Sequence, residues 1–194
     1  MFSILIPTWN NLDYLRMVVQ SIRRHSAHAH QIIVHVNDGS DGTREWVMQQ
    51  QLDATFSTRN VGICLAVNEA AQLAAHDYIV YLNDDMVCLP GWDTALLKRI
   101  KTMPDELFML SGTMVEPKDS GNPCVVVADH GDTVAGFRET DLLKAAPGLR
   151  RHRHSDHPAP CAQRETTPWD TICRAGTPVE VSPHRPEWTL KCGV

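Results

Sequence analysis

Residues 78–86 read YIVYLNDDM, and this stretch decides the fold. Residues 78–82 are a short apolar run, as expected of a strand that is buried on both faces of a parallel sheet. Asn83, Asp84 and Asp85 follow directly. Adjacent carboxylates raise each other's pKa, so two of them at a strand end indicate a counter-cation rather than two solvated aspartates in a loop. We therefore expect a divalent metal ion here, and oxygen ligands of this kind suit Mn²⁺ or Mg²⁺.

The chain on either side alternates short strands with helical patterns, which is typical of βαβ units in a mostly parallel sheet. Further strands are expected at residues 2–6, 32–36 and 108–110, with weaker ones at 55–58 and 125–128. Helical spacing of apolar residues predicts helices at 12–22, 43–51, 65–75, 92–101 and 139–146. With 194 residues, the chain is expected to form a single α/β domain.

Composition and charge limit the partners that the protein is expected to bind and the cellular compartment in which it is expected to lie. The net charge of -5 and the pI of about 6.0 give no reason to expect nucleic acid as a partner. The six cysteines form no CxxC pair, which favours a reduced, cytoplasmic setting. The opening residues lack a charged leader, and no later stretch is long and apolar enough for a membrane span. Any membrane contact is therefore expected to be peripheral, at the inner face. The basic residues 150–154 are expected to be a solvated surface segment, with contact to acidic lipid head groups as the alternative.

Two more loops follow expected strands. Residues 7–10, PTWN, lie where the first strand turns into a helix, and residues 37–43, NDGSDGT, follow the second strand. Ligands of open α/β sheets bind at such strand ends. The glycines permit a tight turn, and Asp41 or Thr43 can cap the next helix, which leaves Asp38 without a structural role. Its carboxylate can accept hydrogen bonds from a nucleobase N–H or a ribose hydroxyl. A proline-punctuated loop with a helix cap explains the first loop equally well.

Taken together, these segments resemble the family-2 inverting glycosyltransferases in order, spacing and residue type. The motifs of that family are a Pro-x-aromatic-Asn turn, an Asp-Gly-Ser-x-Asp-Gly loop, Asn-x-Gly before a helix that carries Asn, and a DxD-type metal motif followed by Pro-Gly-Trp. They stand here at residues 7–10, 38–42 (one residue shorter), 60–68 and 83–92. The resemblance covers residues 1–115 and implies the GT-A fold, a Rossmann-like α/β domain whose mostly parallel sheet is flanked by helices.

The resemblance also implies a nucleotide-sugar donor and a role for each matching residue. Thr8 and Asp38 would contact the base, Asn83 or Asp84 the ribose, and Asp85 the metal. The implied nucleotide-binding set is Pro7, Thr8, Asn10, Asp38, Asn60, Gly62, Asn68, Asn83 and Asp84. In a departure from the family, the first residue of the DxD triplet is Asn83. It brings no charge, so Asp85 should carry most of the metal affinity. Trp9 and Trp92 are expected to be packing residues rather than platforms for a sugar.

The implied reaction is a metal-assisted transfer of a sugar, with inversion, from a donor that we expect to be UDP-linked. The acceptor is an unknown glycan, lipid or protein. Such a transfer needs a carboxylate base within reach of the acceptor hydroxyl. The candidates are Asp129, Asp132, Asp170 and Glu187, of which Glu187 and Asp132 are preferred. Glu187 stands before Trp188, as the family's base precedes an aromatic helix. His130 is expected to be a structural or surface histidine.

Other function classes fit less well. The sequence has no G-x-G-x-x-G after the first strand and no GxxxxGK[ST], which disfavours dinucleotide-dependent oxidoreductases and P-loop enzymes. The serious alternative is a nucleotide-sugar-binding domain with little or no transferase activity, because its acceptor and base region is incomplete. A nucleotidyltransferase is a more distant alternative.

The chain is expected to divide into three segments. Residues 1–115 form the nucleotide-sugar-binding half, and residues 116–149 begin the acceptor-side half. Residues 150–194 hold half of the twelve prolines, between Pro158 and Pro186, and show neither strand nor helix periodicity. This irregular Pro/His/Arg-rich tail is either an acceptor-side region or a segment that is disordered or non-native to the fold. We favour a non-native origin, because a frameshift or truncation in a GC-rich gene produces such a composition.

Overall fold

The computed structural model of the protein describes residues 1–104, 108–119, 125–149, 171–173 and 180–183. Its elements in chain order are β1 (Phe2–Trp9), α1 (Leu12–His25), β2 (Gln31–Asn37), α2 (Thr43–Gln49), β3 (Asp53–Ser57), α3 (Ile63–Ala71), β4 (Tyr78–Tyr81), β5 (Val87–Cys88), α4 (Trp92–Ile100), β6 (Leu110–Ser111), β7 (Thr113–Glu116), β8 (Val125–Val127), α5 (Glu139–Ala145), a 3₁₀ turn (Ala146–Gly148), β9 (Thr171–Cys173) and β10 (Glu180–Pro183). The predicted α/β alternation is confirmed, and each helix and strand expected from the sequence has a counterpart.

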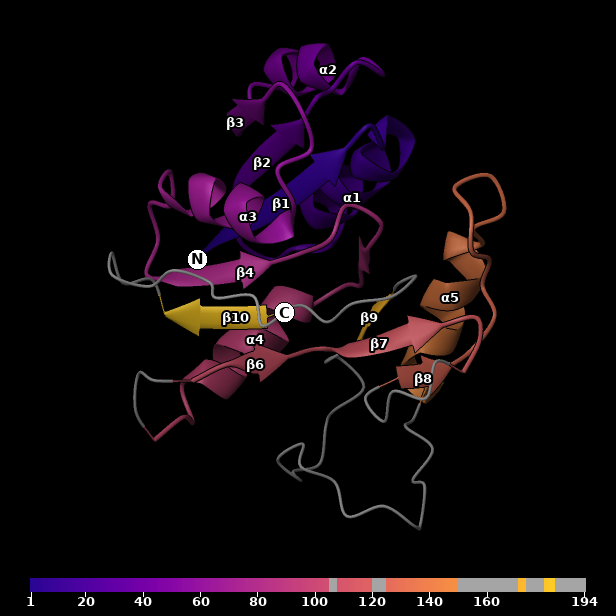
Figure 1. Cartoon of the computed structure of the whole chain (residues 1–194). Coiled ribbons are helices and arrows are strands. Elements are labelled where there is room, and N and C mark those ends of the chain that lie inside the picture. Colours follow the sequence, from indigo (N-terminus) through magenta and orange to yellow (C-terminus); the bar gives the residue numbers. More distant parts are fainter. Residues whose placement is uncertain (105–107, 120–124, 150–170, 174–179, 184–194) are drawn as a thin grey trace.

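The main sheet has six strands in the order β3-β2-β1-β4-β10-β6. β1 pairs in parallel with β2 and with β4, and β2 pairs in parallel with β3, whereas β10 runs antiparallel to β4 and β6. The carboxyl ends of β1, β2 and β4 therefore lie at one edge, and the chain reverses its direction of winding between β1 and β4. Figure 1 shows this sheet beside the smaller sheet β5-β9-β7-β8, next to which α5 lies.

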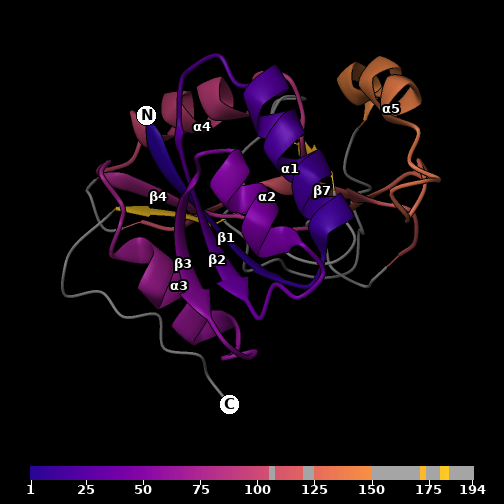
Figure 2. The ribbon, with the colours of Figure 1, turned by 90° about the horizontal axis from the view of Figure 1, so that it is seen from above.

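Alternating side chains of β1 and β2 bury both faces of the sheet, as the period of a strand requires. Ile4 and Val34 pack against buried residues of α1, α2 and α4, such as Trp92, in the largest core cluster. Leu5 and Ile33 point to the other face, where they pack against the α3 side chains. Figure 2 shows α3 on the opposite side of the sheet from α1. Helices on both faces explain why these strands read as continuous apolar runs.

Residues 150–194 depart from the expectation in the two stretches that the structure describes. β9 and β10 are strands, and β10 lies between β4 and β6. The expectation of a segment without strands is wrong there, because three or four residues are too few to show a periodicity and their pairing partners lie far away in sequence. Pro183 stands at the last position of its strand. The non-native origin of the tail, and the boundaries at residues 115 and 149, stay predictions.

The cysteines and the helices bear on the expected location. Cys64 is disulfide-bonded, whereas Cys88 is free and buried. Among the described helices, none combines the length and the apolar character needed to cross a bilayer.

Candidate active site

Side chains link the carboxyl ends of β1, β2 and β4. The Thr8 hydroxyl, at the end of β1, donates to a carboxylate oxygen of Asp84 after β4 (2.6 Å). The Asn10 amide donates to Asp38 after β2 (3.0 Å) and its oxygen accepts the Gly39 N–H (3.0 Å). Asp38 and the Asp84-Asp85 pair therefore stand at one edge of the sheet. This is the arrangement that the sequence predicted.

The backbone at this edge is held in an uncommon conformation. Asn10 (φ 49°) and Asp38 (φ 61°) both adopt the left-handed region, which non-glycine residues rarely enter. Gly39 also has a positive φ, and a Cβ there would lie 2.7 Å from the Val36 side chain. Strain of this kind persists where surrounding contacts fix it, and it is concentrated at functional sites.

Asn37 is a structural centre of the edge that the sequence analysis missed. It is buried at the end of β2, where its amide donates to the Thr8 carbonyl (3.2 Å) and its oxygen accepts the Val61 N–H (2.9 Å). The same oxygen accepts the Ser57 hydroxyl at the end of β3 (3.2 Å). Asn37 thus fixes three loops relative to one another. Its place between an apolar strand and an Asp-Gly turn is the signal that could have identified it.

Asp41 joins the starts of α1 and α2. It accepts the Leu12 N–H (3.0 Å) and both the N–H (3.1 Å) and the hydroxyl (2.6 Å) of Thr43. Burial raises the pKa of Asp41, but these hydrogen bonds lower it more, so its pKa lies below the usual range. Asn11 occupies the N-cap position of α1, yet its side chain bonds Asp84 rather than a backbone N–H of the helix. The backbone N–H of Leu12, the first residue of α1, thus finds its hydrogen-bond acceptor in a loop that is distant in sequence.

Asp84 faces β1 rather than solvent. Burial raises its pKa above the ordinary value, although hydrogen bonds from Thr8 and Asn11 oppose this rise. The Thr8 side chain is itself buried. Its hydroxyl therefore positions Asp84 and is not exposed to a bound nucleobase. Asn83 accepts a hydrogen bond from the Tyr81 hydroxyl. Asp85, the third residue of this triplet, lines a cavity that neither Asn83 nor Asp84 lines.

This cavity brings Asp85 together with residues of the segment 116–149, which the sequence predicted to begin the acceptor side. Its walls include Tyr14, Asp85, His130, Asp132 and Thr133, with apolar side chains of β5, β7 and their neighbours. Its volume is about 40 Å³, which is space for water rather than for a whole sugar. It therefore marks where the loop after β4 meets the loop after β8. Asp38 does not line it, although it stands at the same edge of the sheet.

The loop at residues 129–138, which we call the clamp loop, carries His130 and Asp132 to the cavity. Arg138 donates to the carbonyl (2.7 Å) and the carboxylate (3.2 Å) of Asp129, which also accepts the Gly131 N–H (2.8 Å). Gly131 has a φ of 94°, and a Cβ there would lie 2.2 Å from the Gly136 carbonyl oxygen. Asp129 is therefore occupied in closing the loop, whereas Asp132 faces the cavity.

The remaining predicted residues lie at several places. Pro7 is buried in β1, whereas Asn60 and Gly62 are exposed in the loop before α3 and Asn68 is half-buried in that helix. Trp92 is a packing residue as predicted, at 1% exposed, but the prediction for Trp9 is wrong, because it is 58% exposed beside Asn10. Trp9 is the last residue of β1, and the residues before it in this strand already fill the core. Asp170 and Glu187 lie outside the described residues.

Comparisons with known proteins agree with this architecture. A model of the family described as "Glycosyl transferase family 2" matches residues 3–123. TuaG of Bacillus subtilis (strain 168), whose name describes a teichuronic acid biosynthesis glycosyltransferase, is 30% identical over 89 residues, which are 43% of this chain and 35% of that protein. The chain thus spans about a third of the length of this relative.

Among solved structures, S. aureus TarS (residues 1–349) in complex with UDP-GlcNAc is similar, with a TM-score of 0.53 and 16% identity. The likeness covers 63% of this chain and 37% of that one, and at this identity it shows the fold alone. The family match spans more than half of the chain, and the shared fold is that of the GT-A glycosyltransferases. This protein therefore belongs to glycosyl transferase family 2.

Proposed function

We propose that this chain transfers a sugar, with inversion, from a nucleoside-diphosphate sugar to a glycan, lipid or protein acceptor. One observation carries the proposal. The ends of β1, β2 and β4 are joined by the Asn10–Asp38 and Thr8–Asp84 hydrogen bonds, and Asp85, next to Asp84, lines a cavity shared with Asp132. A nucleoside at Asp38 would thereby have its diphosphate directed toward Asp85.

The nucleoside would bind at Asp38 and Trp9. The Asp38 carboxylate is half-buried and can accept a base N–H or a ribose hydroxyl, and the exposed indole of Trp9 offers an apolar face for stacking. Pro7, Thr8 and Asn10 shape this edge, and Asn60, Gly62, Asn68 and Asn83 stay proposed contacts from the resemblance. UDP is the first nucleotide to test, because the TarS structure of the same fold holds UDP-GlcNAc.

The residues present fit a divalent metal ion. Asp85 offers carboxylate oxygens at the cavity, which suits the oxygen preference of Mn²⁺ and Mg²⁺. Asp84 is committed to Thr8 and Asn11, so Asp85 would be the protein ligand. A bound ion would supply charge neutralisation for the leaving diphosphate.

Asp132 is the base that the geometry favours among the described candidates. Asp129 is engaged by Arg138 and Gly131, whereas Asp132 lines the same cavity as Asp85. In the proposed step, the acceptor hydroxyl gives its proton to the Asp132 carboxylate, and its oxygen forms a bond to the anomeric carbon. The bond from that carbon to the diphosphate oxygen breaks from the opposite face, and its electron pair leaves with the nucleoside diphosphate.

Calorimetry and a turnover assay test the two roles separately. Asp85→Ala should abolish Mn²⁺-dependent UDP binding while the fold stays intact, and Asp132→Asn should keep UDP binding but lose sugar release from a nucleotide-sugar panel. Asp77→Asn, an exposed aspartate before β4 at the opposite end of the strand, is the control for both. Unchanged UDP affinity in Asp85→Ala would refute the metal assignment. UDP binding by the wild type without any sugar release would favour the alternative of a donor-binding domain.

A further inference from the structure

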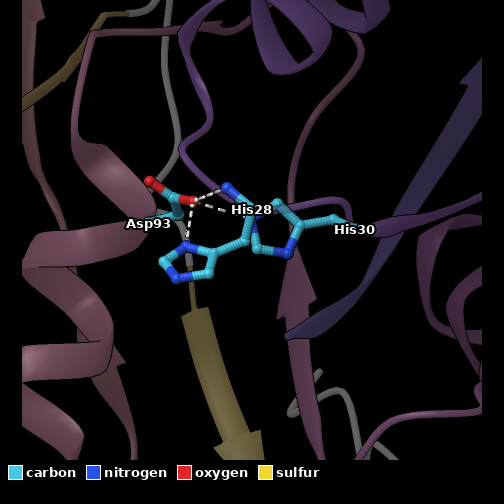
Figure 3. Close-up of side chains that lie close together, drawn as sticks. All are labelled: His28, His30 and Asp93. Carbon is cyan, nitrogen blue, oxygen red and sulfur yellow. Dashed lines mark hydrogen bonds and ion pairs between the residues drawn. The ribbon is translucent and has the colours of Figure 1, made fainter.

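A second cluster of metal-binding residue types lies at the other edge of the sheet. His28 and His30 belong to the loop between α1 and β2, and Asp93 stands in the first turn of α4 (Figure 3). One Asp93 carboxylate oxygen lies 2.9 Å from His28 Nδ1 and 3.1 Å from His30 Nε2. The three ligand atoms all lie within 4.8 Å of one another. Because Phe2 begins β1 and Gln31 begins β2, this edge is opposite to the one that carries Asp38 and Asp85.

The donor set and its burial are those of a transition-metal site rather than of a Mg²⁺ site. Two imidazoles and one carboxylate suit Zn²⁺, which commonly takes three protein ligands and a water. The side chains of Asp93 and His30 are 0% and 1% exposed, so they are held in place by packing, whereas His28 is 45% exposed. A metal ion could therefore reach the cluster from the His28 side.

A cavity supplies the room for that approach. It has a volume of about 420 Å³ and is lined by both histidines, with Arg23, Gln31 and Asp53 among its other walls. Arg23 is turned to Gln50, to which its guanidinium donates (2.7 Å). A water molecule from this cavity can be the fourth ligand of a metal ion that the three side chains hold.

The hydrogen bonds at the cluster define what metal binding must replace. His30 Nδ1 accepts the Phe2 N–H (3.1 Å), so the proton of this ring is on Nε2, where it points to Asp93. Coordination through Nε2 would move that proton to Nδ1 and cost the Phe2 hydrogen bond at the first residue of β1. The loss of this bond and of the two imidazole–Asp93 hydrogen bonds is small beside the binding of a structural zinc ion. Asp93 would keep the Ala27 and His28 N–H groups (2.9 Å each) as it coordinates.

We infer that His28, His30 and Asp93 form a binding site for Zn²⁺ or a similar transition-metal ion. The ion would tie the loop between α1 and β2 to the start of α4. This site is independent of the proposed sugar transfer, because it lies at the other edge of the sheet and uses different ligands.

Zinc titration with saturating Mn²⁺ present tests the inference. The chain has ten histidines, so zinc binding elsewhere is a background that only a comparison of variants removes. His28→Ala, at an exposed ligand, should weaken the tightest zinc site by about 100-fold or more, because even the loss of an indirect partner costs about 10–100-fold. His76→Ala, at a histidine outside the cluster, should bind zinc as the wild type does.

A site-specific readout completes the test. The imidazole ¹⁵N signals of His28 and His30 should shift together when one equivalent of Zn²⁺ is added, and Asp85→Ala should leave this shift unchanged. Equal zinc affinity in the wild type and in His28→Ala, or imidazole signals that stay in place, would overturn the inference and leave Asp93 as a hydrogen-bonded anchor of the loop.

Discussion

The carboxyl ends of β1, β2 and β4, where we propose that the sugar donor binds and which we call the donor edge, are built differently from the clamp loop. The donor edge lies at the ends of three adjacent strands, and side chains such as Thr8 and Asn37 bond from one strand end to the next. The clamp loop is closed within ten residues by Arg138, Asp129 and a glycine pair, and it adjoins the small second sheet. We infer that a fault in the clamp loop disables transfer alone, whereas a fault at the donor edge also disturbs the folded core.

The largest effect is expected from Gly131→Ala, which breaks the clamp loop. The new Cβ would lie 2.2 Å from the Gly136 carbonyl oxygen, at a φ of 94°. The loop must shift, and displacement of an adjoining catalytic group can cost about 100-fold in rate. Sugar release should fall by about this factor, while UDP affinity by calorimetry stays near the wild-type value. Gly148→Ala, which has open space around it, is the control. Equal losses of UDP affinity and turnover would contradict the separation of the two regions.

The next effect is expected from Thr8→Val, which breaks the donor edge with little change in shape. The half-buried Asp84 carboxylate would lose its 2.6 Å hydrogen bond from the hydroxyl. Asp84 keeps its hydrogen bond from Asn11, but a hydrogen bond to a charged group contributes about 1.5–3 kcal/mol, so both the free energy of unfolding and the UDP affinity should fall, the latter by about tenfold. Urea unfolding and calorimetry measure the two effects. Thr58→Val, at an exposed position of the next loop, should change neither. A stable Thr8→Val protein with normal UDP affinity would show that the bond is dispensable.

The sequence predicts the donor edge better than the clamp loop, because the donor edge lies at the ends of apolar strands that the sequence reveals. Asp38 and Asp85 follow directly on apolar strands, so residue type and position along the chain locate them. Asn37 was missed because its role depends on the Thr8 carbonyl and the Val61 N–H, which are distant in sequence. β5 and β7 have two and four residues and carry no readable periodicity. Asp132 was one of four carboxylates until the loop geometry separated it from Asp129.

A smaller effect concerns His35, a buried histidine at the core of the donor half. It contacts Thr55 (2.8 Å) and Ser57 (3.3 Å), and Glu69 lies 3.4 Å away. Burial lowers its pKa below 6.5, although Glu69 opposes this. The unfolded chain therefore binds more protons near pH 6, so the stability from neutral His35 is present above pH 6.5 and is lost as the pH falls through the folded-state pKa.

His35→Gln should accordingly flatten the fall of the melting temperature between neutral pH and about pH 5, where an unperturbed histidine is largely protonated. The variant keeps a side chain that can bond Thr55, so its fold should survive at neutral pH. Scanning calorimetry in a pH series measures the slope. Identical slopes in the wild type and the variant would show that the acid sensitivity of the protein originates elsewhere.

The smallest effect is expected from the ion pair that joins α1 to α5, the helix that follows the clamp loop. Arg24 in α1 donates to both carboxylate oxygens of Glu139 in α5 (3.0 and 2.8 Å), and His25 Nε2 lies 3.2 Å from the same carboxylate. Arg24 is 56% exposed and Glu139 31%, so solvent screens the pair, and exposed pairs contribute about 0.2–1 kcal/mol. A double-mutant cycle of Arg24→Ala and Glu139→Gln should give a coupling energy in this range, with turnover reduced less than about twofold.

The Arg16–Asp13 pair (3.6 Å) supplies the control, because it lies within α1 alone and cannot transmit anything to α5. If α5 and the clamp loop before it are held in place by the second sheet and its core rather than by α1, both cycles should give similar coupling energies and nearly normal turnover. A large loss of transfer in Glu139→Gln would instead mean that this one contact sets the position of the acceptor side. The clamp loop would then depend on α1, and the contrast between a self-contained loop and an interlocked donor edge would fail.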